Sequence, residues 1–208
     1  MITLHHLNFS RSSRVLWLLE ELGLKYNLVK YERNERFRAP PELAKVHPLG
    51  KAPVIQDGDL ILAESAVILN YINAKYGEGR LAPAPGTREH DLHEEWLQYV
   101  ESSAAFPIML KLIGGMTGGL TEGLDRFTGP SISKTLDYVA AGVGQGPYLL
   151  GEIFSLADIQ FSYLLEMAAH GGLLAKYPAL TTYLEQLKSR PAFVRAVEIG
   201  GPMTPPKA

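Results

Sequence analysis

The apolar and polar positions of the first eighty residues alternate between the spacing of strands and the spacing of helices. Residues 1–7 alternate, which predicts a short strand. The apolar residues between Val15 and Leu22 recur at helical spacing and stop at Gly23, so a helix is expected there. Residues 26–31 predict a second strand, and residues 42–45 predict a short helix after a charged loop.

A strand, a tight turn, a second strand and a helix are predicted between residues 52 and 76. Two apolar runs flank Asp57-Gly58, a dipeptide typical of a hairpin turn, and a helical pattern opens at Glu64. Pro53 lies in the first run, although proline has no N–H group for a strand ladder. A cis peptide bond before Pro53, at the start of an edge strand, would accommodate it best.

The second half of the chain is expected to be helical throughout. Residues 77–86 are rich in glycine and proline and predict a linker. A long helix is predicted over residues 87–113 and ends in the glycine-rich segment 114–119, and further helices are predicted over residues 131–143, 155–169, 180–190 and 192–197. We therefore expect an α/β domain, residues 1–80, followed by an all-helical C-terminal domain, residues 87–208.

One helix start in the second half carries a sharp local pattern. Ser155 and Asp158 stand three residues apart in front of an apolar run. This spacing predicts a capping box, in which each side chain satisfies a backbone N–H group of the first helical turn. The pattern indicates helix nucleation rather than contact with a ligand.

Composition narrows the class of protein. The chain has 208 residues, of which 46% are hydrophobic and 20% charged, as in ordinary globular proteins. A net charge of −2 without a basic block argues against a nucleic-acid partner, and no apolar run is long enough to span a membrane. Since cysteine is absent, disulfides, thiolate metal sites and catalysis by a protein thiol are excluded. The N-terminus lacks a secretory signal pattern, so a cytoplasmic protein is expected.

Three groups near the predicted hairpin form a candidate site for a zwitterionic peptide. The backbone of Ala52, turned outward before a cis Pro53, can pair with a peptide bond. Glu64 can bind an ammonium group. Ser65 stands at a helix N-terminus, where backbone N–H groups attract a carboxylate.

The same residues carry a resemblance to a known family. His47-Pro48-Leu49-Gly50-Lys51-Ala52-Pro53, followed by Glu64-Ser65-Ala66-Val67-Ile68, resembles the glutathione-binding half of cytosolic glutathione S-transferases. The pattern of Gly151, Glu152, Ser155 and Asp158 is similar to a signature of the helical domain of that family. The segment 16–23 resembles a bacterial and fungal, serine-type branch of it.

The resemblance implies a fold and a ligand. The fold is a thioredoxin-like N-terminal domain of order β-α-β-α-β-β-α joined to an all-α domain, and the implied assembly is a homodimer. Glutathione is the implied co-substrate, with no metal. The implied glutathione contacts are Lys51, Ala52, Pro53, Glu64 and Ser65, where Lys51 would reach the glycyl carboxylate. One of the arginines 33, 36 and 38 is an alternative contact, although a solvated loop is the simpler interpretation of that segment.

A hydroxyl between the first strand and the first helix is the candidate for activating the thiol. We expect Ser10 to take this role, because it lies at the end of the loop that faces Ala52 and Pro53. Ser12 and Ser13 are the alternatives, and a further one is that no hydroxyl is essential. A capping role in the helix is compatible with catalysis, since the oxygen accepts an N–H while its proton points to sulfur. The family's tyrosine-type members place a tyrosine in the first strand, where this chain has histidines instead.

The second substrate is expected to bind against the long helix and the glycine-rich segment. The resemblance implies an electrophile pocket lined by Phe9, Tyr99, Ser103, Phe106, Met109 and Met116. Residues 114–119 are either a mobile lid or a loop that ends the helix. His90 and His93 lie three residues apart on a helix, and a surface pair is a better interpretation than a metal site.

The expected function is attack of a glutathione thiolate on a small, electrophilic, mostly apolar substrate, with reduction of organic hydroperoxides as a side activity. One alternative is a non-catalytic protein that keeps the transferase-like fold and serves as a binding or docking module. Another is a glutathione-dependent isomerase or dehalogenase, which would share the glutathione site and differ only in the second pocket.

Overall fold

The computed structural model describes residues 1–144 and 146–206, which form two compact units. One unit comprises Met1–Ala82 together with Leu187–Ala208, and the other comprises Pro83–Gln186. This division differs from the one expected from the sequence, which assigned all of residues 87–208 to the helical domain. The difference arises because the last helix packs against the first helix of the chain rather than against the other C-terminal helices.

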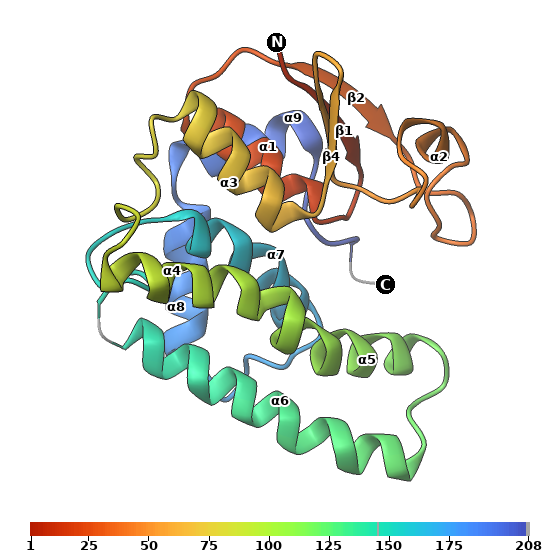
Figure 1. The fold of residues 1–208 in the computed structure, drawn as a ribbon. Helices are drawn as coiled ribbons and strands as arrows, with labels where there is room; N and C mark the ends of the chain where they lie inside the picture. The colour runs from red at the N-terminus through yellow and green to blue at the C-terminus, as the bar shows by residue number, and fades with distance from the viewer. Residues whose placement is uncertain (145, 207–208) are drawn as a thin grey trace. The chain divides into compact units, whose positions relative to one another are not determined.

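The first unit is built on a four-stranded sheet (Figure 1). Its strands are β1 (Thr3–Leu7), β2 (Asn27–Tyr31), β3 (Val54–Asp57) and β4 (Leu60–Ala63), in the spatial order β2-β1-β3-β4. β1 runs parallel to β2 and antiparallel to β3, and β3 and β4 form a hairpin. The two-residue turn of this hairpin has a positive φ of 65° at Gly58, which glycine adopts without steric cost.

The peptide bond between Ala52 and Pro53 is cis, which confirms one part of the expectation for this segment. The other part is wrong, because β3 is not an edge strand: it lies between β1 and β4. The interior position is compatible with proline because the ladder begins one residue later, at Val54, which pairs with His5 on one side and Ala63 on the other. The missing N–H of Pro53 is therefore not required by the sheet.

Helices cover the sheet of the first unit. They are α1 (Ser12–Glu21), α2 (Glu42–Val46), α3 (Ser65–Tyr76) and α9 (Pro191–Gly200), so the predicted order β-α-β-α-β-β-α is confirmed. α1 packs between α3 and α9. The buried Trp17 ring meets Phe193 edge to face with 5.1 Å between ring centroids, and Glu21 forms an ion pair with Arg190. These contacts fix α9 to the N-terminal unit.

The second unit is helical. It contains α4 (Arg88–Tyr99), η1 (Val100–Ala104), α5 (Ala105–Met116), α6 (Glu122–Val143), α7 (Leu156–His170) and most of α8 (Pro178–Lys188). The long helix expected over residues 87–113 is thus a run of α4, η1 and α5, in which η1 is a π-helix. Pro107 explains the irregularity, because it lacks the N–H that would bond to the carbonyl of Ser103 in a regular α-helix.

α6 begins nine residues before the predicted start at residue 131. Glycines 123 and 129 and Pro130 have low helix propensity, but tertiary packing of α6 against α5 outweighs it. Thr121 caps the helix by accepting from the N–H of Leu124, and Glu122 and Asp125 in the first turn complement the helix dipole.

The predicted capping box of α7 is confirmed. The Asp158 carboxylate accepts from the Ser155 N–H at 2.8 Å, and the Ser155 hydroxyl accepts from the Ala157 N–H. Asp158 is fully buried and also accepts from the Tyr183 hydroxyl at 2.6 Å and the Leu149 N–H at 3.0 Å. The box therefore ties α7 to α8 and to the preceding loop, in addition to starting the helix.

The expectation that His90 and His93 form a surface pair on α4 is wrong for His93. His93 is completely buried, whereas His90 is partly exposed. The Nδ1 atom of His93 lies 3.2 Å from the Glu94 carboxylate, and burial lowers the pKa of the imidazole. His93 is thus a core residue of the helical unit.

Candidate functional site

Three serine hydroxyls gather where β1 leads into α1. Ser10 Oγ donates to the Leu7 carbonyl oxygen at 2.8 Å, lies 2.8 Å from Ser12 Oγ and accepts from the Ser12 N–H at 3.2 Å. Ser12 Oγ accepts from the Leu7 N–H at 3.1 Å. Ser13 Oγ is buried and has no hydrogen-bond partner in the described part of the chain. The three hydroxyls therefore differ in the number of hydrogen bonds that they make within the protein.

The ring of His6 fixes the direction of the hydrogen bonds in this cluster. Its Nε2 lies 3.0 Å from the Gly200 carbonyl oxygen and its Nδ1 lies 2.9 Å from Ser12 Oγ. A carbonyl oxygen can only accept, so Nε2 carries a proton. Burial lowers the pKa of His6, which makes the ring neutral at pH 7 and leaves Nδ1 as an acceptor. Nδ1 consequently takes the proton of Ser12.

This assignment saturates Ser12. Its one proton goes to His6, and its two lone pairs accept from the Leu7 N–H and from Ser10. The Ser10 proton is shared between Ser12 Oγ and the Leu7 carbonyl, so it is the proton of the pair that a ligand can take over. The N-cap residue of α1, Arg11, makes no side-chain cap, but Ser10 Oγ satisfies the N–H of Ser12, the first residue of the helix.

A buried arginine connects this cluster to the start of α3. Arg14 lies one turn after Ser10 on α1, is 0% exposed, and donates from Nη1 to Ser65 Oγ at 3.1 Å. Ser65 is itself buried and is the first residue of α3. Within one compact unit, the hydrogen bond from Arg14 to Ser65 therefore holds the N-terminus of α1, with its hydroxyl cluster, beside the N-terminus of α3.

Glu64 precedes α3 in an uncommon backbone conformation. It is exposed, serves as the N-cap residue, and has φ 69° and ψ 116°. Positive φ is unfavourable for a residue with a Cβ atom, and such conformations cluster at ligand-binding sites. The carboxylate thus stands at the surface directly before the N–H groups of the helix.

The remaining predicted contacts lie in the segment before β3. Lys51 is exposed and Ala52 is partly exposed, and both precede the first ladder residue, Val54. The backbone of Ala52 is therefore outside the sheet ladder. Pro53 is buried.

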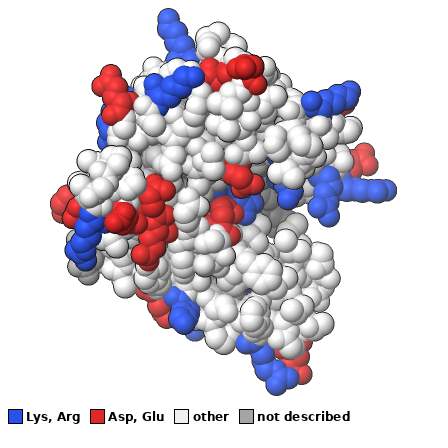
Figure 2. Space-filling view, viewed as in Figure 1, with Lys and Arg blue, Asp and Glu red and all other residues white. Residues whose placement is uncertain are grey.

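The arginines of the loop before α2 separate into two groups. Arg33 donates to the carbonyl oxygens of Asn8, Phe9 and Phe37, so its guanidinium holds the loop together. Residues 36 and 38 are exposed. Figure 2 shows charges of both signs scattered over the visible face, with Lys and Arg atoms gathered on the side where Figure 1 places α2.

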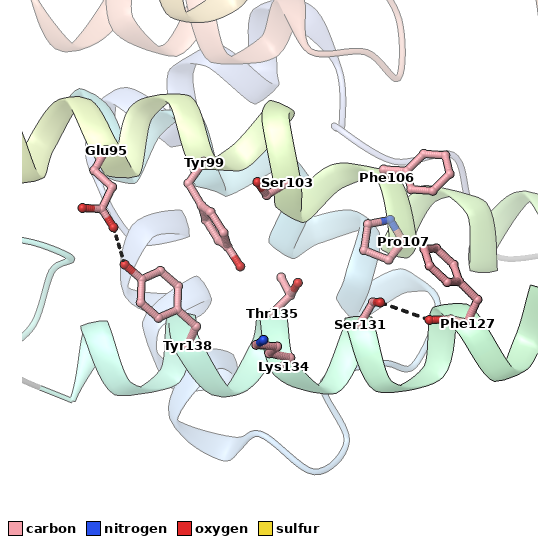
Figure 3. Close-up of a pocket in the computed structure, with 10 residues that line it drawn as sticks. All are labelled: Glu95, Tyr99, Ser103, Phe106, Pro107, Phe127, Ser131, Lys134, Thr135 and Tyr138. Atoms are coloured by element: carbon pink, nitrogen blue, oxygen red, sulfur yellow. Dashed lines mark hydrogen bonds between the residues drawn. The ribbon is translucent and has the colours of Figure 1, made fainter.

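The helical unit contains a cavity of about 600 Å³. Figure 3 shows Tyr99 from α4 and Tyr138 from α6 pointing into the space between these helices, and a hydrogen bond of 2.7 Å from the Tyr138 hydroxyl to Glu95 closes one end. This hydrogen bond raises the pKa of Tyr138 to about 12. The cavity is lined by Glu95, Tyr99, Ser103, Phe106, Pro107, Phe127, Ser131, Lys134, Thr135 and Tyr138.

The expected electrophile pocket agrees with this cavity only in part. Tyr99, Ser103 and Phe106 line it, but Met109 and Met116 do not. Phe9 belongs to the other unit, where its ring stacks on Phe37. The glycine-rich segment ends α5 at Met116, and its glycines at 118 and 119 have positive φ, which is typical of a helix-ending loop.

Sequence reasoning missed two residues of the site. Arg14 and His6 are both buried and polar, and each contacts a predicted site serine. An arginine within an otherwise apolar helical pattern was the available signal for Arg14, because charged residues are seldom fully buried without partners. For His6, the contact to Gly200 joins residues 194 positions apart and leaves no local trace in the sequence.

The described residues contain neither a metal-binding cluster nor a helix that could span a membrane. No group of three or more His, Asp or Glu side chains in this part of the chain is arranged to hold a metal ion. Among the described helices, none combines the length and apolar character needed to cross a membrane.

Comparisons with known proteins agree on one family. The family model described as glutathione S-transferase, N-terminal domain, matches residues 1–74, and the model for the C-terminal domain matches residues 121–195. Glutathione S-transferase 1 of Saccharomyces cerevisiae is 32% identical over 95% of this chain and 94% of its own length.

Solved structures give the same result. A glutathione S-transferase from Actinobacillus pleuropneumoniae is 37% identical with a TM-score of 0.88, covering 96% of this chain and 93% of its own. A glutathione transferase homologue from Sulfitobacter, solved with bound glutathione, has the same fold at 24% identity, with a TM-score of 0.81 and coverage of 97% and 99%.

Proposed function

The chain belongs to the glutathione S-transferase family, and on that premise we propose that it holds the glutathione thiol as a thiolate for attack on an electrophilic, mostly apolar substrate. The observation that carries this proposal is the buried hydrogen bond from Arg14 to Ser65. It joins the N-terminus of α1, with its hydroxyl cluster, to the N-terminus of α3 within one compact unit. A thiol and a carboxylate of one small peptide can therefore be bound together.

Each end of glutathione has a matching group in this unit. The γ-glutamyl carboxylate is assigned to Ser65 and the N–H groups of α3, and the ammonium to Glu64. The backbone of Ala52, outside the ladder and next to Pro53, pairs with the cysteinyl part of the main chain. Lys51 is exposed and is assigned to the glycyl carboxylate.

Among the three serines, Ser10 is the proposed catalytic residue. Ser12 is saturated, whereas the Ser10 proton can move from the Leu7 carbonyl to a sulfur atom. Ser10 also accepts from the Ser12 N–H, which polarises its own O–H bond and strengthens it as a donor. Ser13, whose hydroxyl lacks a partner among the described residues, is the alternative.

The required stabilisation is within the reach of one hydroxyl and one helix end. A free thiol has a pKa of about 8.5, and lowering it by two units takes about 2.7 kcal/mol. A hydrogen bond to a charged acceptor supplies roughly 1.5–3 kcal/mol, and a helix N-terminus up to about 2 kcal/mol. The same thiolate could reduce an organic hydroperoxide, which is the proposed side activity.

We assign the electrophile to the cavity of the helical unit. Four of its ten lining residues are aromatic, Tyr99 and Phe106 among them, and its volume of about 600 Å³ suits a small organic molecule. Filling the cavity with Ser103→Phe should weaken turnover of a bulky electrophile while the KM for glutathione stays constant. Ser102→Phe is the matched control, since Ser102 is adjacent to Ser103 and is not a lining residue.

The assembly proposed is a homodimer in the cytoplasm. Ile113 and Met116 on α5 and Leu124 on α6 are exposed apolar residues that do not line the cavity, so a second copy would cover an apolar surface beside it. A cytoplasmic location is proposed because a free thiol co-substrate persists in a reducing compartment. If Ser103→Phe changes the sedimentation from dimer to monomer, the cavity belongs to the subunit interface and the electrophile assignment is wrong.

Retention on glutathione resin, followed by an assay with chlorodinitrobenzene, tests the proposed function. Retention with turnover supports the transferase. Retention without turnover of any electrophile or hydroperoxide would favour the non-catalytic binding module, and turnover restricted to isomerisation or dehalogenation would favour those glutathione-dependent reactions. Failure to bind glutathione would overturn the proposal.

A further inference from the structure

His6 connects the start of α1, six residues further along the chain, to the end of α9, which is 194 positions away. It lies in β1, is 2% exposed, and contacts both the N-terminus of α1, through Ser12 Oγ, and the end of α9, through the Gly200 carbonyl. A Cβ atom at position 200 would lie 2.5 Å from Leu16 Cδ2 and 3.0 Å from His6 Nε2, so a side chain there would force these neighbours to shift. The C-terminal end of α9 is thus fitted to the ring of His6.

The His6 ring determines which acceptor the Ser10 hydroxyl donates to. Because Gly200 fixes the proton on Nε2, Nδ1 accepts from Ser12, and Ser12 cannot donate to Ser10 or to the Leu7 carbonyl. The Leu7 carbonyl, which lies 2.8 Å from Ser10 Oγ and 3.1 Å from Ser12 Oγ, is then left to Ser10. Without the Nδ1 acceptor, the Ser12 proton would compete for that carbonyl and displace the Ser10 hydroxyl.

We propose that His6 is a positioning residue for thiol activation, acting through Ser12 to hold the Ser10 hydroxyl in the orientation that a bound thiolate needs. This inference rests on the proposed function of Ser10. His6 does not touch the substrate, and its effect is on the geometry of the donor rather than on the binding of glutathione.

Two conservative variants separate this role from that of a structural clamp. In His6→Asn, the side-chain oxygen replaces Nδ1 as the acceptor for Ser12, and the contact to Gly200 is lost. In His6→Gln, the longer amide replaces Nε2 as the donor to Gly200, and the acceptor for Ser12 is lost. A clamp needs the Gly200 contact, whereas positioning of Ser10 needs the Ser12 contact.

The measurement is the pKa of glutathione's thiol in the complex, taken from the pH dependence of thiolate absorbance, together with the melting temperature of each variant. We expect His6→Asn to keep the wild-type thiol pKa and His6→Gln to raise it by about one unit, which is a tenfold loss of thiolate. His5→Gln is the matched control: His5 is the preceding residue of β1, is also buried, and contacts Tyr31 instead of the serines.

Three outcomes decide the inference. A raised thiol pKa in His6→Gln with rescue in His6→Asn supports it. Equal thiol pKa values in both variants, whatever their melting temperatures, would overturn it while leaving the proposed function intact. If the wild-type protein binds no glutathione thiolate, or if Ser10→Ala leaves the thiol pKa unchanged, the assignment of Ser10 fails and the role of His6 fails with it.

Discussion

Replacing Ser10 by alanine removes the hydroxyl that is proposed to face the glutathione sulfur. The structure indicates that this change should affect the stability of the fold only moderately. Ser10 is 5% exposed, and its Oγ contacts the Leu7 carbonyl, the Ser12 hydroxyl and the Ser12 N–H. The loss of these neutral hydrogen bonds should cost about 1–3 kcal/mol, which is less than the total stability of a typical domain, so the variant should fold.

The magnitude follows from the kind of hydrogen bond that is lost. A hydroxyl that donates to a thiolate donates to a charged acceptor, which contributes roughly 1.5–3 kcal/mol. If this stabilisation is present in the transition state, kcat/KM falls by roughly 10- to 150-fold. Glutathione affinity should change little, because the contacts assigned to Glu64 and Ser65 remain.

The assay is steady-state conjugation of chlorodinitrobenzene, with glutathione binding measured in parallel by calorimetry. Ser13→Ala is the matched control. Ser13 is also 5% exposed, and its hydroxyl has no hydrogen-bond partner among the described residues that the change could leave unsatisfied. Ser12→Ala removes the acceptor of the Leu7 N–H and should lower the free energy of unfolding by about 1–3 kcal/mol.

The reasoning is refuted if Ser10→Ala retains wild-type turnover. In particular, loss of turnover in Ser13→Ala with full activity in Ser10→Ala would show that the unpartnered hydroxyl is the catalytic one. Loss of glutathione binding in Ser10→Ala would show instead that the hydroxyl serves the binding of the peptide.

Three further predictions concern the packing around the site and the core. Arg14→Met removes the donor to Ser65, so glutathione should bind at least roughly tenfold more weakly in calorimetry, and unchanged affinity would contradict the link between the two helix ends. Hydrogen bonds from Lys75 and two tyrosines lower the pKa of Asp57, so its stabilising contribution is complete above the unfolded pKa of about 3.9 and is lost as the pH falls below it. Asp57→Asn should therefore make the urea midpoint less dependent on pH below about pH 5, and an unaltered pH dependence would contradict this. Gly142→Ala places a Cβ atom 2.6 Å from the Trp96 ring and should lower the melting temperature, whereas Gly129→Ala, with open space around it, should not.

The order of secondary structure could be predicted from the sequence because it depends on local patterns. Alternation, helical spacing, the Asp57-Gly58 turn and the capping box at Ser155 and Asp158 act over a few residues, and the structure confirms each of them. The first turns of α6 could not be predicted, because glycines and a proline favour a loop locally and only packing against α5 overrides them.

The position of β3 in the sheet was also beyond local reasoning. Pro53 indicates where a ladder cannot begin, but not which strands flank the one that follows. Likewise, the buried position of His93 depends on the helices around α4 rather than on its own spacing from His90. The placement of α9 on α1 depends on contacts such as Trp17 with Phe193, which are 176 positions apart in the chain.

The residues of the candidate site likewise divide into those that the sequence predicts and those that only the fold shows. The residues proposed from motifs, such as Glu64 and Ser65, lie on one short segment and could be named from the sequence. The residues that hold them, Arg14 and His6, act across 51 and 194 positions respectively, and their roles follow only from distances in the fold.

The central claim is that glutathione binds across the N-termini of α1 and α3 with its thiol on Ser10. A crystal structure of the glutathione complex tests this most directly. We predict the sulfur within hydrogen-bonding distance of Ser10 Oγ, the γ-glutamyl carboxylate on Ser65, and the peptide backbone paired with Ala52. A tripeptide bound elsewhere, or a sulfur directed to Ser13 or to no hydroxyl, would contradict the account.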